Sequence, residues 1–261
     1  LVKSALSSTL SCKALPTAWQ PLSGNEDSLM ILLVGGEKGG SGKSCLAQNI
    51  AVYFSREKNA NVMLVDCDPQ RTSSDWVQER HTDPSLPWIN CVQMYGKIRY
   101  ELKSLEMHYD VVIVDCGGQD SVALRSAMVV ASHVLFPLRP KRRDLKTLEH
   151  LEDLVSACNV VNPEMIVGCV ITQSPSLPNQ AGRILDAKEV CKSFNIRVLD
   201  AITYNRNAYD DSEEKGLSVM DVEPDGKAAQ EIRDIVTELM SMKAIQEDGA
   251  DRSEEKVASA R

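Results

Sequence analysis

The sequence predicts an α/β fold: a doubly wound, mostly parallel sheet with helices on both faces. Short runs rich in Val, Ile and Leu alternate with segments whose apolar residues recur at helical spacing. These runs are apolar at consecutive positions, which is typical of parallel strands covered on both faces. Polar clusters follow three of the runs, and ligands in such sheets bind at the carboxyl ends of the strands.

The elements follow from these two periodicities. The predicted strands are residues 30–34, 61–66, 88–94, 111–115, 133–137, 164–172 and 196–202. The predicted helices are residues 43–57, 73–80, 97–107, 121–131, 144–160, 179–194 and 226–242. We expect one domain at residues 30–243. We interpret 1–29 as a disordered extension or an added leader, and 244–261 as a charged flexible tail.

Composition excludes several classes of protein. The 261 residues carry a net charge of -8, which argues against a constitutively basic nucleic-acid binder. Eight cysteines without a C-x-x-C pair predict reduced thiols in a cytoplasmic protein. The four histidines lack metal-site spacing, and no apolar run is long enough to span a membrane.

The segment 35–44, GGEKGGSGKS, joins a predicted strand to a predicted helix. Glu37 stands where the generic phosphate-loop pattern needs a glycine, yet the end of the pattern is intact. Glycines let backbone N–H groups approach phosphate, Lys43 would reach the β- and γ-phosphates, and Ser44 would bind Mg²⁺. The alternative is a Gly-rich turn with a chance lysine. The strand–loop–helix context favours nucleotide binding, with predicted contacts from Gly39, Gly40, Ser41, Gly42, Lys43, Ser44 and Cys45.

Two further acidic clusters end predicted strands. In VDCDPQ, Asp66 or Asp68 can hold a Mg²⁺-bound water while its neighbour points toward an attacking water, although Asp-Pro also begins ordinary turns. In YDVVIVDCGG, the apolar run ending at Asp115 is typical of a Walker B strand, whose carboxylate holds Mg²⁺ through water. Gly117 and Gly118 indicate a mobile loop beside the γ-phosphate.

Taken together, these motifs resemble the deviant Walker A, switch I and Walker B motifs of the ParA/MinD ATPases. The residues that carry the resemblance are Lys38-Gly39-Gly40-x-Gly42-Lys43-Ser44, Asp66-x-Asp68-Pro69-Gln70 and Asp115. Segment 201–235 is similar to the late segment of the small ParA-type plasmid partition ATPases that lack an N-terminal helix-turn-helix. Segment 136–145 falls where they carry a proline-containing stretch. The resemblance covers about residues 30–243.

The resemblance implies roles for individual residues. Lys38 would be the signature lysine, reaching across an ATP-bound homodimer to the phosphates of the partner. Asp68 would position the attacking water, and Asp66 would support Mg²⁺ together with Ser44 and Asp115. Gln70 and the loop 116–119 would sense the γ-phosphate. This second loop departs from the family, because it contains Cys-Gly-Gly-Gln-Asp instead of the common Thr-Pro-Pro. Gln173 and Asn205 are candidates for the base pocket.

The densest basic run lies in the proline-containing stretch and comprises Arg139, Lys141, Arg142, Arg143 and Lys146. Contact with DNA phosphates is one interpretation, and a dimer would double the patch. A solvated helix start is the alternative. Cysteines 45, 67 and 116 adjoin the nucleotide motifs. We favour a role as small buried core residues for them over a metal or redox role. The acidic C-terminal segment lacks the apolar face of a membrane-binding helix.

Two functions remain open. The first is an ATP-hydrolysing DNA partition protein: a cytoplasmic, nucleoid-associated dimer that binds DNA without sequence preference and is stimulated by a centromere-binding, ParB-like partner. The second is a MinD-like spatial regulator or assembly ATPase that acts on a protein complex instead of DNA.

Overall fold

The computed structural model describes residues 29–117, 122–194 and 196–243. The interpretations of 1–28 and 244–261 lie outside the described residues. The strands are β1 (Met30–Val34), β2 (Val62–Asp66), β3 (Asn90–Gln93), β4 (Val111–Asp115), β5 (His133–Leu138), β6 (Ile166–Ser174) and β7 (Val198–Tyr204). They form one sheet in the order β3-β2-β4-β1-β5-β6-β7, and every neighbouring pair is parallel. The predicted doubly wound α/β class is confirmed, and the sheet is parallel throughout.

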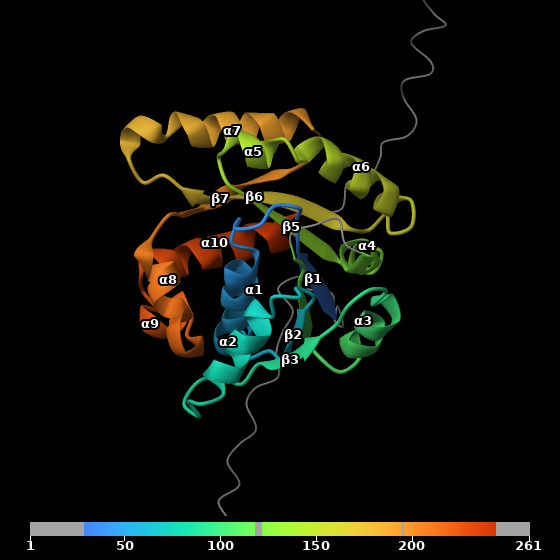
Figure 1. Ribbon diagram of the computed structural model, residues 1–261, viewed down its shortest axis with the longest axis vertical. Coiled ribbons are helices and arrows are strands. Elements are labelled where there is room, and N and C mark those ends of the chain that lie inside the picture. The colour runs from blue at the N-terminus through green and yellow to red at the C-terminus, as the bar shows by residue number, and fades with distance from the viewer. Residues whose placement is uncertain (1–28, 118–121, 195, 244–261) are drawn as a thin grey trace, which may run out of the picture.

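Helices cover both faces of this sheet, as Figure 1 shows. One face carries α1 (Lys43–Val52), α2 (Thr72–Arg80), α9 (Val219–Val222) and α10 (Lys227–Ser241). The other carries α3 (Arg99–Glu106), α4 (Val122–Met128), α6 (Leu148–Asn159) and α7 (Gly182–Ser193). The short α5 (Arg142–Leu145) packs against α7, and α8 (Asn207–Glu213) packs against α9.

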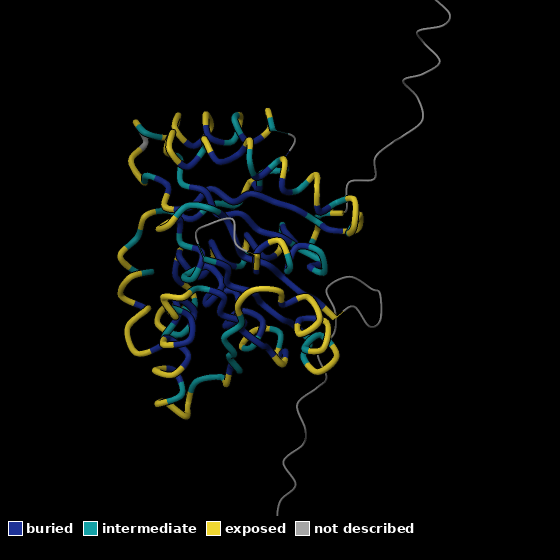
Figure 2. Tube along the Cα trace, turned by 45° about the vertical axis from the view of Figure 1, so that its right-hand side comes forward, coloured by how far each residue is buried: buried dark blue, intermediate teal, exposed yellow. Residues whose placement is uncertain are grey.

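The apolar runs form strands because both of their faces are buried. In β1, Leu32 and Val34 enter the core beneath α1 and α10, while Ile31 and Leu33 enter the core beneath α4 and α6. Each of these four side chains is fully buried, and Figure 2 shows the buried stretches running along the centre of the molecule. This two-sided core holds the carboxyl ends of β1, β2 and β4 at one edge.

Several boundaries differ from prediction. The expected helix 144–160 is divided into α5 and α6, because Thr147 folds back and donates through both its N–H and Oγ1 to the carbonyl of Asp144. The expected helix 43–57 ends as α at Val52 and continues as one π-helical turn, Tyr53–Glu57. Helices α8 and α9 were not predicted, because both are short and lack a long apolar stripe.

A buried ion pair ties α2 to α9. The Arg80 side chain is 1% exposed, and its Nη1 lies 2.8 Å from Asp221 Oδ2. Asp221 also accepts from Arg56 and from the N–H and hydroxyl of Ser218. Burial alone would raise the pKa of Asp221, but the hydrogen bond and charge of Arg80 lower it overall. The pair therefore stabilises the fold while Asp221 is ionised.

Replacing Asp221 with Ala is expected to lower the free energy of unfolding by about 3–5 kcal/mol, because it leaves the buried Arg80 charge without an anion. Urea unfolding at pH 7 measures this, and the exposed Asp225→Ala variant is the matched control. The folded-state pKa of Asp221 is lowered, so the difference from wild type should shrink as the pH falls below 3.8. Equal losses in both variants would contradict the assigned role of the ion pair.

Candidate functional site

The loop between β1 and α1 is held from outside by four side chains. Each of four consecutive backbone carbonyls accepts from one of these side chains: Lys38 O from Lys43 Nζ (2.7 Å), Gly39 O from Arg139 Nη2 (3.2 Å), Gly40 O from Gln173 Nε2 (3.0 Å) and Ser41 O from Thr172 Oγ1 (2.8 Å). Gly40 and Gly42 have φ of 71° and 84°, a backbone conformation that favours glycine. These side-chain hydrogen bonds and the two glycines therefore fix the shape of the loop.

The start of α1 offers an anion site. The N–H groups of Lys43, Ser44 and Cys45 lie in the first helical turn, where no intrahelical acceptor exists. The Lys43 side chain is buried beside them. Burial lowers the pKa of Lys43, and the nearby Asp115 and Asp68 partly oppose that shift. These donors and this cation can bind phosphate oxygens.

Asp115 is fully buried, with an exposed fraction of 0%. Its Oδ2 accepts from Ser73 Oγ at 2.7 Å, while its buried Oδ1 has no hydrogen-bond partner in the described part of the chain. Burial raises the pKa of Asp115 to about 6, although Ser73 and Ser44 lower it in part. An unsatisfied carboxylate oxygen beside the hydroxyl of Ser44 fits a divalent cation held through water.

No cluster of three or more His, Cys, Asp or Glu side chains suited to a metal occurs among the described residues. A cation at Asp115 would therefore depend on Ser44, phosphate oxygens and water. Mg²⁺ fits this donor set, because it commonly uses one or two carboxylates together with substrate phosphates.

Asp66 and Asp68 have different surroundings. Both oxygens of the fully buried Asp66 are used within the chain: Oδ1 accepts from the N–H of Asp68 at 3.0 Å, and Oδ2 from the N–H and Oγ of Ser74 at 2.8 Å. Asp66 thus shapes the loop that carries Asp68, and its direct support of Mg²⁺ stays a prediction. Asp68 lines the phosphate cleft, and its Oδ1 accepts from the N–H of Gln70 at 2.9 Å.

Asp68 also packs closely against the segment that follows β4. A Cβ placed on Gly117 would lie 2.6 Å from Asp68 Oδ2, so only glycine permits this approach. The two segments expected to sense the γ-phosphate therefore touch each other. Residues 118–121, which include Gln119 of the expected sensor, lie outside the described residues.

Lys38 stands at the outer edge of the loop and is partly exposed. Its side chain makes no hydrogen bond or ion pair with any residue that the structure describes. The preceding Glu37 is engaged instead by His150 of α6, with 2.9 Å between Nε2 and Oε1. A contact of Lys38 with a second copy stays a prediction.

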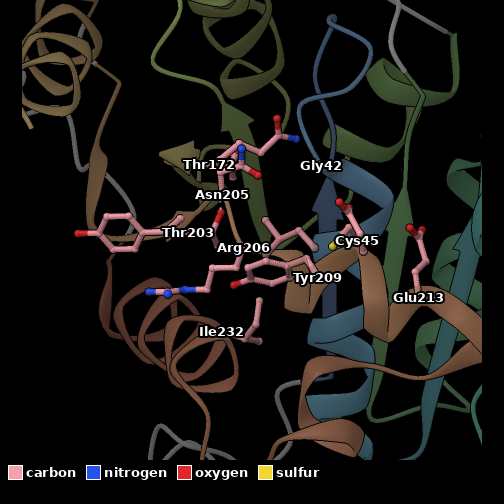
Figure 3. Close-up of a pocket in the computed structure, with 13 residues that line it drawn as sticks. Gly42, Cys45, Thr172, Thr203, Asn205, Arg206, Tyr209, Glu213 and Ile232 are labelled. Atoms are coloured by element: carbon pink, nitrogen blue, oxygen red, sulfur yellow. Dashed lines mark hydrogen bonds between the residues drawn. The ribbon is translucent and has the colours of Figure 1, made fainter. Parts of the chain in front are cut away.

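Two adjoining cavities extend from the loop. The phosphate cleft, of about 740 Å³, is lined by the loop, Asp68 and Gly117, and a smaller cavity of about 200 Å³ continues from it. Cys45 and Gln173 line both cavities, which places them at the junction. Asn205 lines the smaller one. Figure 3 shows Cys45, Tyr209 and Ile232 converging on that cavity from α1, α8 and α10.

The smaller cavity includes residues that the sequence did not indicate. Tyr209 of α8 donates to Glu231 at 2.8 Å, and Arg206 donates to the same carboxylate at 2.7 Å. Glu231 is buried on α10, next to an apolar face. The sequence carries one indication of this site: the charged Glu231 directly precedes Ile232 of the apolar stripe on α10. Cys45 remains a thiol there, because burial raises its pKa to about 12.

One of the five cations in the basic run is engaged within the protein, and the other four are exposed. Arg139 forms a two-pronged ion pair with the buried Asp144, with Nε–Oδ2 at 2.7 Å and Nη2–Oδ1 at 3.0 Å, in addition to its bond with the loop. This residue therefore has a structural role that was not expected from the sequence. The other four cations, Lys141, Arg142, Arg143 and Lys146, are exposed.

Comparison with known families tests the resemblance noted in the sequence. The sequence model of the CobQ/CobB/MinD/ParA nucleotide binding domain matches residues 32–219. The chain belongs to this family. It is therefore a nucleotide-binding protein of the ParA/MinD ATPase family, as predicted, and the match spans the loop, Asp66, Asp68 and Asp115.

Individual relatives within the family differ in role. The chain is 30% identical over 114 residues to Protein ParA of Rhizobium radiobacter, covering 44% of this chain and half of that relative's length. It is 26% identical over 184 residues to Maintenance of carboxysome distribution protein A of Gloeobacter kilaueensis, covering 70% and 80% of the two chains. A solved plasmid partition protein from Borrelia burgdorferi, bound to AMPPNP, has the same fold, with a TM-score of 0.62, 17% identity and coverage of 80% and 98%.

One further observation concerns membranes. Within residues 29–117, 122–194 and 196–243, no helix combines the length and the apolar character needed to cross a bilayer.

Asp115→Asn is expected to stabilise the nucleotide-free protein by about 1–3 kcal/mol at pH 8. The folded-state pKa of Asp115 is raised from 3.8 to about 6, so its ionised form destabilises the fold above pH 6. That penalty disappears as the pH falls toward 3.8, and the advantage of the variant should disappear with it. Urea unfolding at pH 8 and pH 4.5 measures both. Asp66→Asn is the contrasting variant, expected to lose stability because Asp66 is fully hydrogen-bonded. A less stable Asp115→Asn protein at pH 8 would refute the argument.

Proposed function

We propose that this protein hydrolyses ATP and uses its ATP-bound state as a switch for DNA partition. The observation that carries the proposal is the constrained loop beside three acids at the ends of two adjacent strands. Its carbonyls are held by Lys43, Arg139, Gln173 and Thr172, so that the helix N-terminus faces the cleft containing Asp68. Membership of the ParA/MinD family supports ATP as the nucleotide.

Each residue of the cleft has a role in the proposed reaction. The N–H groups at the start of α1 bind the phosphates, and Lys43 leaves the carbonyl of Lys38 to pair with them. Ser44 and Asp115 would hold Mg²⁺, which when bound neutralises charge on the β- and γ-phosphate oxygens. Asp68 orients water for in-line attack on the γ-phosphate, and Lys38 of one protomer stabilises the phosphates of its partner. The smaller cavity, lined by Gln173 and Asn205, takes the base.

The DNA part of the proposal rests on the exposed cations around α5. Lys141, Arg142, Arg143 and Lys146 are exposed and lie within seven residues of Arg139, which donates to the loop at Gly39. Movement of the loop on ATP binding would therefore pass through the Arg139–Gly39 hydrogen bond to the segment that carries the four exposed cations. A dimer would present the patch twice, which raises affinity for a long polyanion. A centromere-binding, ParB-like partner would then stimulate hydrolysis and release.

Fluorescence anisotropy with an arbitrary labelled duplex tests this function. Binding should require ATP and Mg²⁺ and should weaken steeply with salt, because phosphate contacts release counterions. Replacing Arg142 and Arg143 with Ala should weaken binding for every sequence. The exposed Lys192 of α7 provides the control substitution. ATP-dependent dimers that bind no DNA at low salt would refute the partition function.

A second candidate is a positioning ATPase that acts on a protein complex. The relative named for carboxysome distribution favours it, because the match covers 80% of that protein. The two candidates differ in what the ATP-bound dimer holds. Capture of a protein complex by ATP-bound dimers that do not bind duplex DNA at low salt would favour the second function.

A further inference from the structure

Two cysteines occupy equivalent places beside Asp66 and Asp115. Cys67 follows Asp66 at the end of β2, and Cys116 follows Asp115 at the end of β4. The strands are parallel neighbours in which Asp66 is paired with Asp115, and the N–H of Cys67 donates to the carbonyl of Asp115 at 2.9 Å. The two cysteines are therefore the next pair of the same ladder.

The geometry of this pair suits a covalent link. Both side chains belong to the core beneath α3 and α4, so they project from the same face of the sheet. Neighbouring strands are about 4.8 Å apart, within the Cα–Cα range of roughly 4.4–6.8 Å that disulfides span. Both thiols are free, and the neighbouring Cys67 together with burial raises the pKa of Cys116 well above its usual range.

Access to the pair comes from the nucleotide cleft. Cys67 lines that cleft together with Asp68 and Gly117, whereas Cys116 is completely buried behind it. A reagent entering the cleft therefore meets Cys67 first. Bound nucleotide would occupy the same space and block the approach.

We propose that Cys67 and Cys116 form a redox modification site that a low-molecular-weight disulfide converts into an intramolecular disulfide. The Cys67 thiolate attacks one sulfur of the reagent, forming a mixed disulfide and releasing one small thiolate. The Cys116 thiolate then attacks Cys67 Sγ and releases the second. The protein loses two thiol protons and two electrons, and the reagent is reduced to two thiols.

The bond would act directly on the loops that the proposed reaction needs. It joins the residue between Asp66 and Asp68 to the residue between Asp115 and Gly117. Asp68 already packs against Gly117, where an added Cβ would lie 2.6 Å from Asp68 Oδ2, so a covalent link at the adjacent residues would restrict the movement of Asp68 relative to Gly117. We expect the oxidised protein to lose ATP turnover and to regain it on reduction. This consequence rests on the proposed ATPase function, whereas formation of the disulfide does not.

The chain supplies its own control pair. Cys169 of β6 and Cys191 of α7 are also neighbouring thiols, and both are fully buried. Neither lines the phosphate cleft or the smaller cavity. Because the reagent cannot reach either of these two thiols, the pair should stay reduced under conditions that oxidise Cys67 and Cys116. Cys45 also lines the cleft with Asp68, but burial raises its pKa to about 12, so it is expected to react slowly and to stop at a mixed disulfide with the reagent.

The experiment treats the full folded chain with glutathione disulfide and maps peptides by mass spectrometry without reduction. The expected result is a Cys67–Cys116 link that forms about tenfold more slowly with ADP and Mg²⁺ at ten times the Kd, because only the free cleft reacts. Cys116→Ser should stop at a mixed disulfide on Cys67, Cys67→Ser should leave Cys116 unmodified, and Cys169→Ser should behave as wild type.

Two results would overturn the proposal. One is a folded wild-type protein in which Cys45 becomes modified while Cys67 and Cys116 stay reduced. The other is a link that forms at the same rate with and without a nucleotide shown to bind. Nucleotide that fails to bind even the reduced protein would instead count against the proposed function, while link formation alone would still support the thiol pair.

Discussion

Replacing Asp68 with Ala is expected to abolish ATP turnover and to leave ATP binding and dimerisation in place. Asp68 lines the phosphate cleft, and among the described residues no hydrogen bond joins its side chain to the loop that would hold the phosphates. Its proposed task is to orient the attacking water, a contribution of about 10²–10⁴ in rate for a positioned acid or base. Steady-state phosphate release measures turnover, a fluorescent ATP analogue measures binding, and light scattering measures the dimer.

The Asp68→Ala substitution removes both the carboxylate charge and a hydrogen bond that shapes the loop. Asp68 Oδ1 accepts from the N–H of Gln70, and an asparagine can keep this bond while lacking the carboxylate charge. Asp68→Asn should therefore fold as wild type and still be inactive. Asp75→Ala, an exposed position on α2, is the matched control and should retain turnover. Normal turnover in either Asp68 variant would refute the assigned role.

Much of this site could be predicted because its chemistry is local in sequence. Gly40, Gly42, Lys43 and Ser44 lie within five residues, and a strand-to-helix junction imposes their arrangement. Asp66 and Asp115 each end an apolar run, and parallel strands bring such ends to one edge of the sheet. Short-range periodicity was therefore sufficient for the fold class and for the position of the cleft.

The supports of the loop could not be predicted, because they come from distant segments. Gly39 is held by a side chain 100 residues later, and Gly40 by one 133 residues later. Arg139 belonged to a basic run interpreted either as a DNA contact or as a solvated helix start, since nothing local shows that Asp144 is buried and pairs with it. Helix α9 had a local signal, the capping box from Ser218 to Asp221, but its four residues carry no periodicity.

Replacing Lys38 with Ala is expected to lower dimer-coupled hydrolysis by about 10³-fold or more, the scale of charged fingers supplied in trans. The affinity of the monomer for ATP should change little. The backbone carbonyl of Lys38 is the atom that supports the loop, accepting from Lys43 and Ser41, and the substitution leaves that carbonyl in place. Lys192→Ala removes an exposed cation elsewhere and is the control.

Complementation decides whether Lys38 acts across the dimer. In a mixed dimer of Lys38→Ala and Asp68→Ala protomers, action in trans leaves one complete site, because the Lys38→Ala protomer keeps Asp68 and receives the lysine of its partner. Random pairing of equal amounts then restores about a quarter of wild-type turnover, since half of the dimers are mixed and each has one of two sites. Action in cis leaves no complete site in any dimer, so mixing would restore nothing. That second result would show that Lys38 acts on the phosphates of its own protomer. The proposal of an ATP-bound dimer would then lose the support of Lys38.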